Sequence, residues 1–408
     1  MSYMKINPNR LFLKLVLLFP ITTLFQTMIP QINKILFGII FILLLTFYLK
    51  KLTLKNMMIL LFLCITMTFD IVITKEKLYN SNELFYLPFF VIFYTYISDN
   101  NKKFHTLIKE NKKYVYNIIY IWTILVAISL FMKSSWVSEW GKAKYFGSLC
   151  KSVWRFVPTC TFISSLIILI FNINKDKHAI YLMILPMFGF FMSGSRTYMV
   201  VGICLFIIFW YYYVNKKINF ILSLLPISAM LIIAILNSAM VNKFNAVSYN
   251  KNSYFDYMGT ITSGRSIFWK ADIENFKSSG FINKMLGNGF NFIYKVNYKA
   301  FGGLVWAHND FIQCIVSHGI IGLIMYIYTL LSCILSIINA KKDKLIFTLA
   351  ILVWLFNAFF NMFYTYFCSM LSFPFLLFAI TDGMRKFRIT KKVKNEEDIK
   401  SIAFIKES

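Results

Sequence analysis

The sequence is a succession of long apolar stretches separated by short polar segments. Most stretches are close to the roughly 17–25 residues that an α-helix needs to cross the hydrocarbon core of a bilayer. Because a helix satisfies its backbone polar groups within its own segment, this pattern predicts an all-α integral membrane protein. We expect about twelve transmembrane helices, at residues 11–29, 33–49, 56–74, 84–98, 114–132, 156–173, 178–194, 197–214, 218–241, 310–338, 344–361 and 363–381.

Composition and charge exclude several other classes of protein. Hydrophobic residues make up 58% of the chain and charged residues 15%, whereas soluble domains have about 45–50% and 25%. The net charge of +26 does not indicate nucleic-acid binding, because the basic residues lie between apolar spans, as in multi-span membrane proteins. The seven cysteines form no CxxC pair, so no structural zinc site or disulfide framework is predicted, and no cofactor is expected.

Lysine and arginine are concentrated in every second connection between spans, which predicts the orientation of the chain. We expect both termini in the cytoplasm and the two long loops, residues 133–155 and 242–309, on the outer face, away from ATP and nucleotide-sugars. The chain then divides into nine spans in residues 1–241, a large outer loop (242–309), three spans in residues 310–381 and a basic tail (382–408). The tail is interpreted as an orientation signal, although contact with anionic lipid is an alternative.

The first candidate site is Ser193-Gly194-Ser195-Arg196-Thr197, a tight break between two spans. Gly194 lets the backbone turn, and the hydroxyl side chains can satisfy freed backbone groups. An arginine at a membrane edge is more often an anchor that extends its charged group into water. The alternative is that the planar guanidinium of Arg196 binds a phosphate at the depth of the lipid headgroups.

The second candidate is Arg265, at the start of an expected amphipathic helix in the outer loop. Thr262 or Ser263 can cap this helix and Gly280 can end it. Arg265 then lies in the first turn, where free backbone N–H groups favour an anion, although a solvated loop arginine is equally compatible with the pattern. Four apolar residues at helical spacing predict that one face is buried in the outer leaflet: Ile267, Phe268, Ile273 and Phe276.

The third candidate is His308, which is followed by Asn309 and Asp310 where the tenth span begins. A lone interfacial histidine is more often structural, but a neutral imidazole with an ordinary pKa of about 6.5 can accept a proton. We therefore treat His308 as a candidate catalytic base and Asn309 and Asp310 as candidate substrate ligands. His318, followed by Gly319, indicates instead a site of close helix packing.

The polar loop offers few carboxylates for metal chemistry. Between residues 240 and 308 only Asp256, Asp272 and Glu274 are acidic, and no DxD-like pair is present to hold a metal against a diphosphate. P-loop, GxSxG and HExxH motifs are also absent from the sequence. No metal site is predicted.

Taken in order, these motifs resemble the O-antigen polymerase/ligase superfamily. The resemblance covers about residues 190–330 and rests on the Ser-Gly-Ser-Arg break, the Gly-Arg-x-x-x-Trp segment, the Gly-Asn-Gly-Phe turn, and His-Asn-Asp-Phe followed by Gly-Ile-Ile-Gly. It implies a GT-C-like, metal-independent glycosyltransferase of the bacterial cytoplasmic (inner) membrane. Arg196 and Arg265 would bind the diphosphate of a polyprenyl-diphosphate-linked glycan donor. His308 would activate or position the hydroxyl of the glycan acceptor.

Within this superfamily we favour a polymerase, which joins lipid-linked repeat units into O-antigen, capsular or exopolysaccharide. One alternative is a ligase, which moves finished glycan to a lipid core. Another is a flippase or exporter, which would use the same arginines only to bind its cargo. The implied partners are the lipid-linked donor and acceptor, membrane lipid, a chain-length regulator and a separate flippase, with no nucleic acid.

The lysine pattern makes a prediction that labelling can test. Single cysteines introduced into a cysteine-free background within residues 242–309 should react with a membrane-impermeant maleimide on intact cells. Cysteines at Lys103, Lys216 and Lys342 should react only after the membrane is opened. A cytoplasmic location for the 242–309 loop would contradict the orientation and would put the candidate residues on the wrong face for a lipid-linked glycan.

Overall fold

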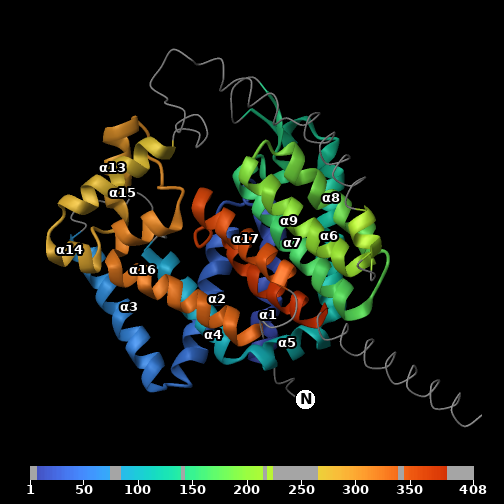
Figure 1. The fold of residues 1–408 in the computed structure, drawn as a ribbon, viewed down its shortest axis with the longest axis horizontal. Coiled ribbons are helices and arrows are strands. Elements are labelled where there is room, and N and C mark those ends of the chain that lie inside the picture. The colour runs from blue at the N-terminus through green and yellow to red at the C-terminus, as the bar shows by residue number, and fades with distance from the viewer. Residues whose placement is uncertain are drawn as a thin grey trace, which may run out of the picture.

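The computed structural model describes residues 7–73, 84–138, 143–214, 218–223, 265–338 and 344–383, and it is predominantly helical (Figure 1). The helices of the first part are α1 (Pro8–Leu24), α2 (Ile32–Leu49), α3 (Leu54–Ile73), α4 (Tyr86–Asp99), α5 (Asn101–Glu110), α6 (Lys112–Leu130), α7 (Val153–Asn174), α8 (Ala179–Met192) and α9 (Arg196–Val214). The second part has α13 (Arg265–Ser278), α14 (Phe281–Leu286), α15 (Phe290–Phe301), α16 (Asp310–Ile337), α17 (Lys344–Phe360) and a C-terminal helix, Phe367–Gly383.

Each of the first eight and the last three predicted spans coincides in residue range with a helix of the structure. Within the described residues, six helices are long and apolar enough to cross a membrane, namely α2, α3, α6, α7, α9 and α16. The helices α8, α17 and the C-terminal helix are apolar but shorter. Beyond residue 223 the predicted ninth span lies outside the described residues, as does the basic tail beyond residue 383. The total of twelve spans therefore stays a prediction.

Three helices form the centre of the bundle. Every residue of α4 from Tyr86 to Ile97 is buried, and α7 is buried along almost its whole length. The C-terminal helix contacts α4 and α7. The hydroxyl of Tyr94 in α4 donates to the carbonyl of Met370 (2.7 Å), and the side-chain amide of Asn172 in α7 donates to the carbonyl of Ala379 (3.0 Å). A helix that is apolar on all sides is stable only when it is covered on all sides, which explains why these three are central.

The predicted outer loop 133–155 contains a small hairpin, so the fold is not purely helical. Strand β1 (Trp136–Val137) pairs antiparallel with β2 (Tyr145–Phe146), between the short helical turns η2 (Lys133–Ser135) and η3 (Ser148–Cys150). The ring of Phe146 packs edge-on against Phe156 of α7, with centroids 5.2 Å apart. The hairpin therefore packs against the first turns of α7.

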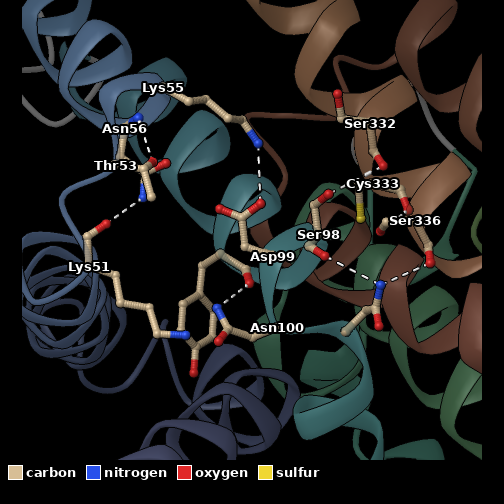
Figure 2. Close-up of polar contacts among 12 residues, drawn as sticks. Lys51, Thr53, Lys55, Asn56, Ser98, Asp99, Asn100, Ser332, Cys333 and Ser336 are labelled. Carbon is tan, nitrogen blue, oxygen red and sulfur yellow. Dashed lines mark hydrogen bonds and ion pairs between the residues drawn. The ribbon is translucent and has the colours of Figure 1, made fainter.

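Basic residues of the predicted inner loops gather at one end of the bundle, which we call the basic end. Figure 2 shows part of it, where Lys55 Nζ lies 3.2 Å from Asp99 Oδ1 and the hydroxyl of Ser98 donates to the carbonyl of Ser332 (3.3 Å). These contacts join α3, α4 and α16. Further contacts at this end link Arg10 with Asn111, Lys109 with Asp382, and Tyr116 with Asp176.

Helix α16 is broken near its start, and the break is filled by another segment. Gly319 has φ 69° and ψ −174°, which interrupts the helical hydrogen bonds. The carbonyls of Val316 and Ser317 lose their partners in the next turn and accept instead from the backbone N–H groups of Asn288 (2.9 Å) and Gly289 (3.1 Å). The predicted Gly-Asn-Gly turn is thus a backbone clamp on α16, since carbonyls released by a break need new donors.

Two glycines make this clamp possible. A Cβ atom on Gly287, where φ is 98°, would lie 2.0 Å from the carbonyl oxygen of Ser317. A Cβ atom on Gly319 would lie 2.2 Å from the carbonyl oxygen of Met285. We expected the segment at His318 and Gly319 to be a site of close helix packing, and this prediction is confirmed, because Gly319 of α16 packs against Met285 at the end of α14 and against Gly287 just after it.

The loop predicted to be outer, residues 242–309, differs from its predicted form in the part that the structure describes. Its described part holds three helices, α13 to α15, which pack against α16 and lie away from α6 to α9 (Figure 1). We expected α13 to lie on the membrane with one apolar face, yet its buried residues are Phe268 and Asp272, and Ile273 is 38% exposed. Helix α13 packs against α15 and α16, so neighbouring helices decide which side it buries. The predicted cap at Thr262 or Ser263 lies outside the described residues.

The clamp leads to a prediction about stability. Gly287→Ala should unfold or displace α13 to α15, because the left-handed backbone alone costs about 1–3 kcal/mol for other residues and the methyl group would overlap the Ser317 carbonyl. Limited proteolysis and thermal unfolding in detergent measure the effect. Gly280→Ala is the matched control, since a Cβ at Gly280 meets nothing within 4 Å. Equal stability of the two variants would contradict the proposed importance of the clamp.

Candidate active site

The candidate residues lie where the starts of α7, α9, α13 and α16 meet the turn between α17 and the C-terminal helix. These segments are distant in sequence, and their connecting order places them at the end of the bundle opposite the basic end. We call this end the site end.

Arg196 is placed by a tight break between α8 and α9. Gly194 has φ 67°, which only glycine adopts readily. The hydroxyl of Ser193 accepts from the backbone N–H of Ser195 (3.3 Å) and donates to the carbonyl of Phe190 (2.9 Å). Ser193 and Ser195 are buried, so the break is rigid and Arg196, half-buried, begins α9 at a fixed position.

Arg265 is the first described residue of α13 and is half-buried. Burial lowers the pKa of its guanidinium to about 10. The nearby Tyr366 raises this pKa, and the positive charge of Arg196 lowers it further. Arg265 is still a cation at neutral pH. The structure therefore brings Arg196 and Arg265 within electrostatic reach of each other, although they lie on different helices and far apart in sequence.

His308 lies between two aromatic rings. The centroid of its imidazole is 6.3 Å from that of Trp154 on α7 and 6.2 Å from that of Phe268 on α13. Part of the residue is exposed, but its Nδ1 atom is buried and has no hydrogen-bond partner among the described residues. Burial and the charge of Arg265 lower the pKa of His308 to about 3. The imidazole is neutral at physiological pH and lies close to the guanidinium of Arg265.

The backbone that carries His308 is held on both sides. The N–H of Ala307 donates to the side-chain oxygen of Gln313 (3.1 Å), and the carbonyl of Ala307 accepts from the indole N–H of Trp269 (2.5 Å). His308 itself has φ 51°, a left-handed conformation that persists only where surrounding contacts impose it. Trp269 therefore links α13, which carries Arg265, to the residue before the histidine.

Asn309 and Asp310 hold the start of α16. The side-chain oxygen of Asn309 accepts from the backbone N–H groups of Phe311 (3.0 Å) and Ile312 (3.1 Å), as helix-capping residues do. Asp310 is fully buried, and its carboxylate accepts from the hydroxyl of Tyr326 at 2.5 Å. Both side chains contact the chain itself in this structure, and the carboxylate of Asp310 faces the interior of the bundle.

Sequence reasoning missed two aromatic residues of this region. Trp154 contacts His308, and Tyr366, in the turn after α17, is within electrostatic reach of Arg265. Trp154 is followed by Arg155 at the start of a span, which is the same arrangement that drew attention to Arg196. That signal was present in the sequence. Tyr366 had no comparable signal, because its role depends on the folded position of one turn.

Metal binding has no obvious donor set in the part of the chain that the structure describes. No three His, Cys, Asp or Glu side chains in these ranges are grouped so that they could hold a metal ion. Asp272 is buried in α13, and burial raises the pKa of its carboxyl to about 8. Metal independence stays a prediction.

Comparison with known proteins agrees with the motifs. Residues 181–327, about a third of the chain, match the family model described as O-antigen ligase. No curated protein matches the chain. The matched segment runs from α8 into α16 and contains Arg196, Arg265 and His308. Residues 181–327 are therefore similar to the O-antigen ligase family, and this match supports the resemblance to the O-antigen polymerase/ligase superfamily.

Proposed function

We propose that the protein polymerises polyprenyl-diphosphate-linked oligosaccharide repeat units at the outer face of the bacterial cytoplasmic membrane, giving O-antigen, capsular or exopolysaccharide. One observation carries this proposal: Arg196, Arg265 and His308 come from three segments and meet at one end of the bundle. The outward placement of that end rests on the lysine-rich loops, which lie at the opposite end.

The two arginines suit a diphosphate leaving group. In the proposed reaction the hydroxyl oxygen of the acceptor sugar attacks the anomeric carbon of the donor, and the bond from that carbon to the diphosphate breaks. Negative charge then builds up on the departing polyprenyl diphosphate. Guanidinium groups already in position stabilise such charge, and their planar donors match phosphate oxygens. The reaction in this form needs no metal ion.

His308 is the proposed base for the acceptor hydroxyl. Burial and the charge of Arg265 lower the pKa of His308 to about 3, so the imidazole is neutral but a weak base. A bound diphosphate would offset the positive charge of Arg265, and an opposite charge favours protonation. Donor binding should therefore raise the pKa of His308 and strengthen the base. Asn309 and Asp310 contribute by fixing the start of α16, on which the position of His308 depends.

Ligase activity is the second candidate, because the matching family model is described as O-antigen ligase. A ligase would use the same arginines and histidine but a different acceptor. The two functions differ in their products: a polymerase yields chains of increasing length on polyprenyl diphosphate, and a ligase transfers a finished glycan once. Incubation of the purified protein with a single lipid-linked repeat unit, with no other acceptor, distinguishes them by gel analysis.

A third prediction concerns the arginines. If Arg196 and Arg265 each bind phosphate through the planar guanidinium, Arg→Lys should impair polymerisation nearly as much as Arg→Ala, because an ammonium cannot reproduce the paired donors. Each loss should be about 2–4 kcal/mol of transition-state stabilisation, by analogy with removal of one oxyanion donor.

Arg10→Lys is the matched control, since Arg10 is exposed at the basic end. The measurement is the rate of chain growth at equal protein level. Full activity of both Lys variants at positions 196 and 265 would return these residues to the role of membrane anchors.

A fourth prediction concerns His308. General-base assistance is typically worth about 10²–10⁴-fold, so His308→Ala should give a correctly inserted protein that accumulates single lipid-linked repeat units. His308→Gln keeps hydrogen-bonding capacity but cannot take a proton at neutral pH. Substantial polymer from the Gln variant would make His308 a positioning residue. Normal chain length from the Ala variant would favour a flippase or exporter, which needs cationic binding but no base.

The pH dependence gives an independent check on the same residue. A base must be neutral to act, so activity should fall as the pH drops through the pKa of His308. The acid limb of kcat/KM, which reports the free enzyme, should lie at lower pH than the limb of kcat, which reports the complex. The separation should be roughly 1–3 units if the bound diphosphate raises the pKa. Coincident limbs would contradict coupling between donor binding and the base.

A further inference from the structure

A hollow lined by cationic side chains adjoins the candidate active site. Its volume is about 390 Å³, within the range of about 300–1,000 Å³ that is typical of small-molecule pockets. The hollow lies between the hairpin of α1 and α2, the start of α7 and the turn before the C-terminal helix. The lining side chains that matter here are Gln26, Asn33, Lys34, Trp154, Arg155, Trp306 and Tyr366.

Aromatic side chains separate this hollow from the active site. Trp154 lines the hollow and also lies 6.3 Å from His308, centroid to centroid. Tyr366 lines the hollow and is within electrostatic reach of Arg265. The ring of Trp306 packs edge-on to Tyr366, with centroids 6.1 Å apart. A molecule in the hollow would therefore contact the aromatic groups that border the imidazole and the guanidinium.

The charged residues that line the hollow are all basic. Lys34 and Arg155 are both exposed, and no residue that lines the hollow is acidic. Asn33 donates through its amide nitrogen to Thr23 and Gln26, each at 3.1 Å. Its amide oxygen is buried and has no hydrogen-bond partner among the described residues. The hollow therefore offers two cations, one unused acceptor and several aromatic faces.

We propose that this hollow binds an acidic sugar, a saccharide residue that carries a carboxylate. Lys34 and Arg155 would pair with the carboxylate through charge-assisted hydrogen bonds. The oxygen of Asn33 would accept from a sugar hydroxyl, and the indole faces of Trp154 and Trp306 would cover the C–H faces of the ring. A lone metal ion would have no use for these aromatic faces, and a neutral sugar would leave the cations without a partner.

The inference rests on the proposed function for its biological meaning, since the acidic sugar would belong to the glycan that the enzyme extends. An acidic residue bound in the hollow would place a neighbouring sugar of the same chain beside His308. Lys34 and Arg155 would then determine specificity, because repeat units without a carboxylate would lose this contact. Neither residue is part of the candidate active site.

Binding of free glucuronate to the full-length protein in detergent tests the proposal, with tryptophan fluorescence as the signal. Glucose, which lacks the carboxylate, should bind at least about tenfold more weakly, because a hydrogen bond to a charged group contributes enough for such a factor. Lys34→Gln and Arg155→Gln should each weaken glucuronate binding by a similar factor. Lys133→Gln, an exposed lysine of the same outer loop as Arg155, should leave it unchanged.

Two further arms separate the possible outcomes. Arg196→Ala should still bind glucuronate, so loss of polymerisation in that variant with binding retained would separate the hollow from the reaction chemistry. Equal binding of glucose and glucuronate, or normal glucuronate binding by a Lys34→Gln/Arg155→Gln double variant, would overturn the proposal. A change in tryptophan fluorescence with short-chain phosphatidylglycerol, together with no change with glucuronate, would also overturn the proposal. That result would assign the hollow to a lipid headgroup.

Discussion

The backbone pairing between residues 288–289 and the break in α16 is the interaction on which the site depends. A carbonyl without a donor is costly in a medium that contains little water, so Val316 and Ser317 hold the Gly287–Gly289 turn firmly. This turn joins α14 to α15, and α15 supports α13. The position of α13 relative to α16, and with it the distance between the Arg265 and His308 segments, follows from a few backbone hydrogen bonds.

Electrostatics complements this mechanical connection. Two guanidinium groups near one another repel, and the buried imidazole beside them stays neutral. A bound anion would relieve this repulsion and allow the imidazole to take a proton. In the proposed mechanism the same groups would both select an anionic ligand and respond to its binding. The aromatic rings of Trp154 and Phe268 flank the imidazole, and apolar neighbours of this kind strengthen electrostatic interactions by lowering the local dielectric.

Much of the helix pattern was predictable, because apolar length and the lysine distribution report directly on the membrane. Arg196 and His308 could be singled out because each follows a recognisable break at the edge of a span. The buried side of α13 could not be predicted, since it is decided by α15 and α16 rather than by its own periodicity. The break at Gly319 was also missed, because its compensation comes from residues about thirty positions earlier. Asp310 seemed available to substrate by its neighbourhood in sequence, yet it is buried against Tyr326.

The distance in sequence between Arg196 and His308 has a consequence for how the protein is made. The break that carries Arg196 is complete once α8 and α9 have been synthesised, but more than a hundred residues must follow before His308 emerges from the ribosome. In the proposed orientation, the segment between them must cross the membrane before α16 inserts. The backbone clamp between the Gly287–Gly289 turn and the break at Gly319 can form only after both events. A nascent chain therefore cannot bring Arg196 and His308 together until α16 has been inserted.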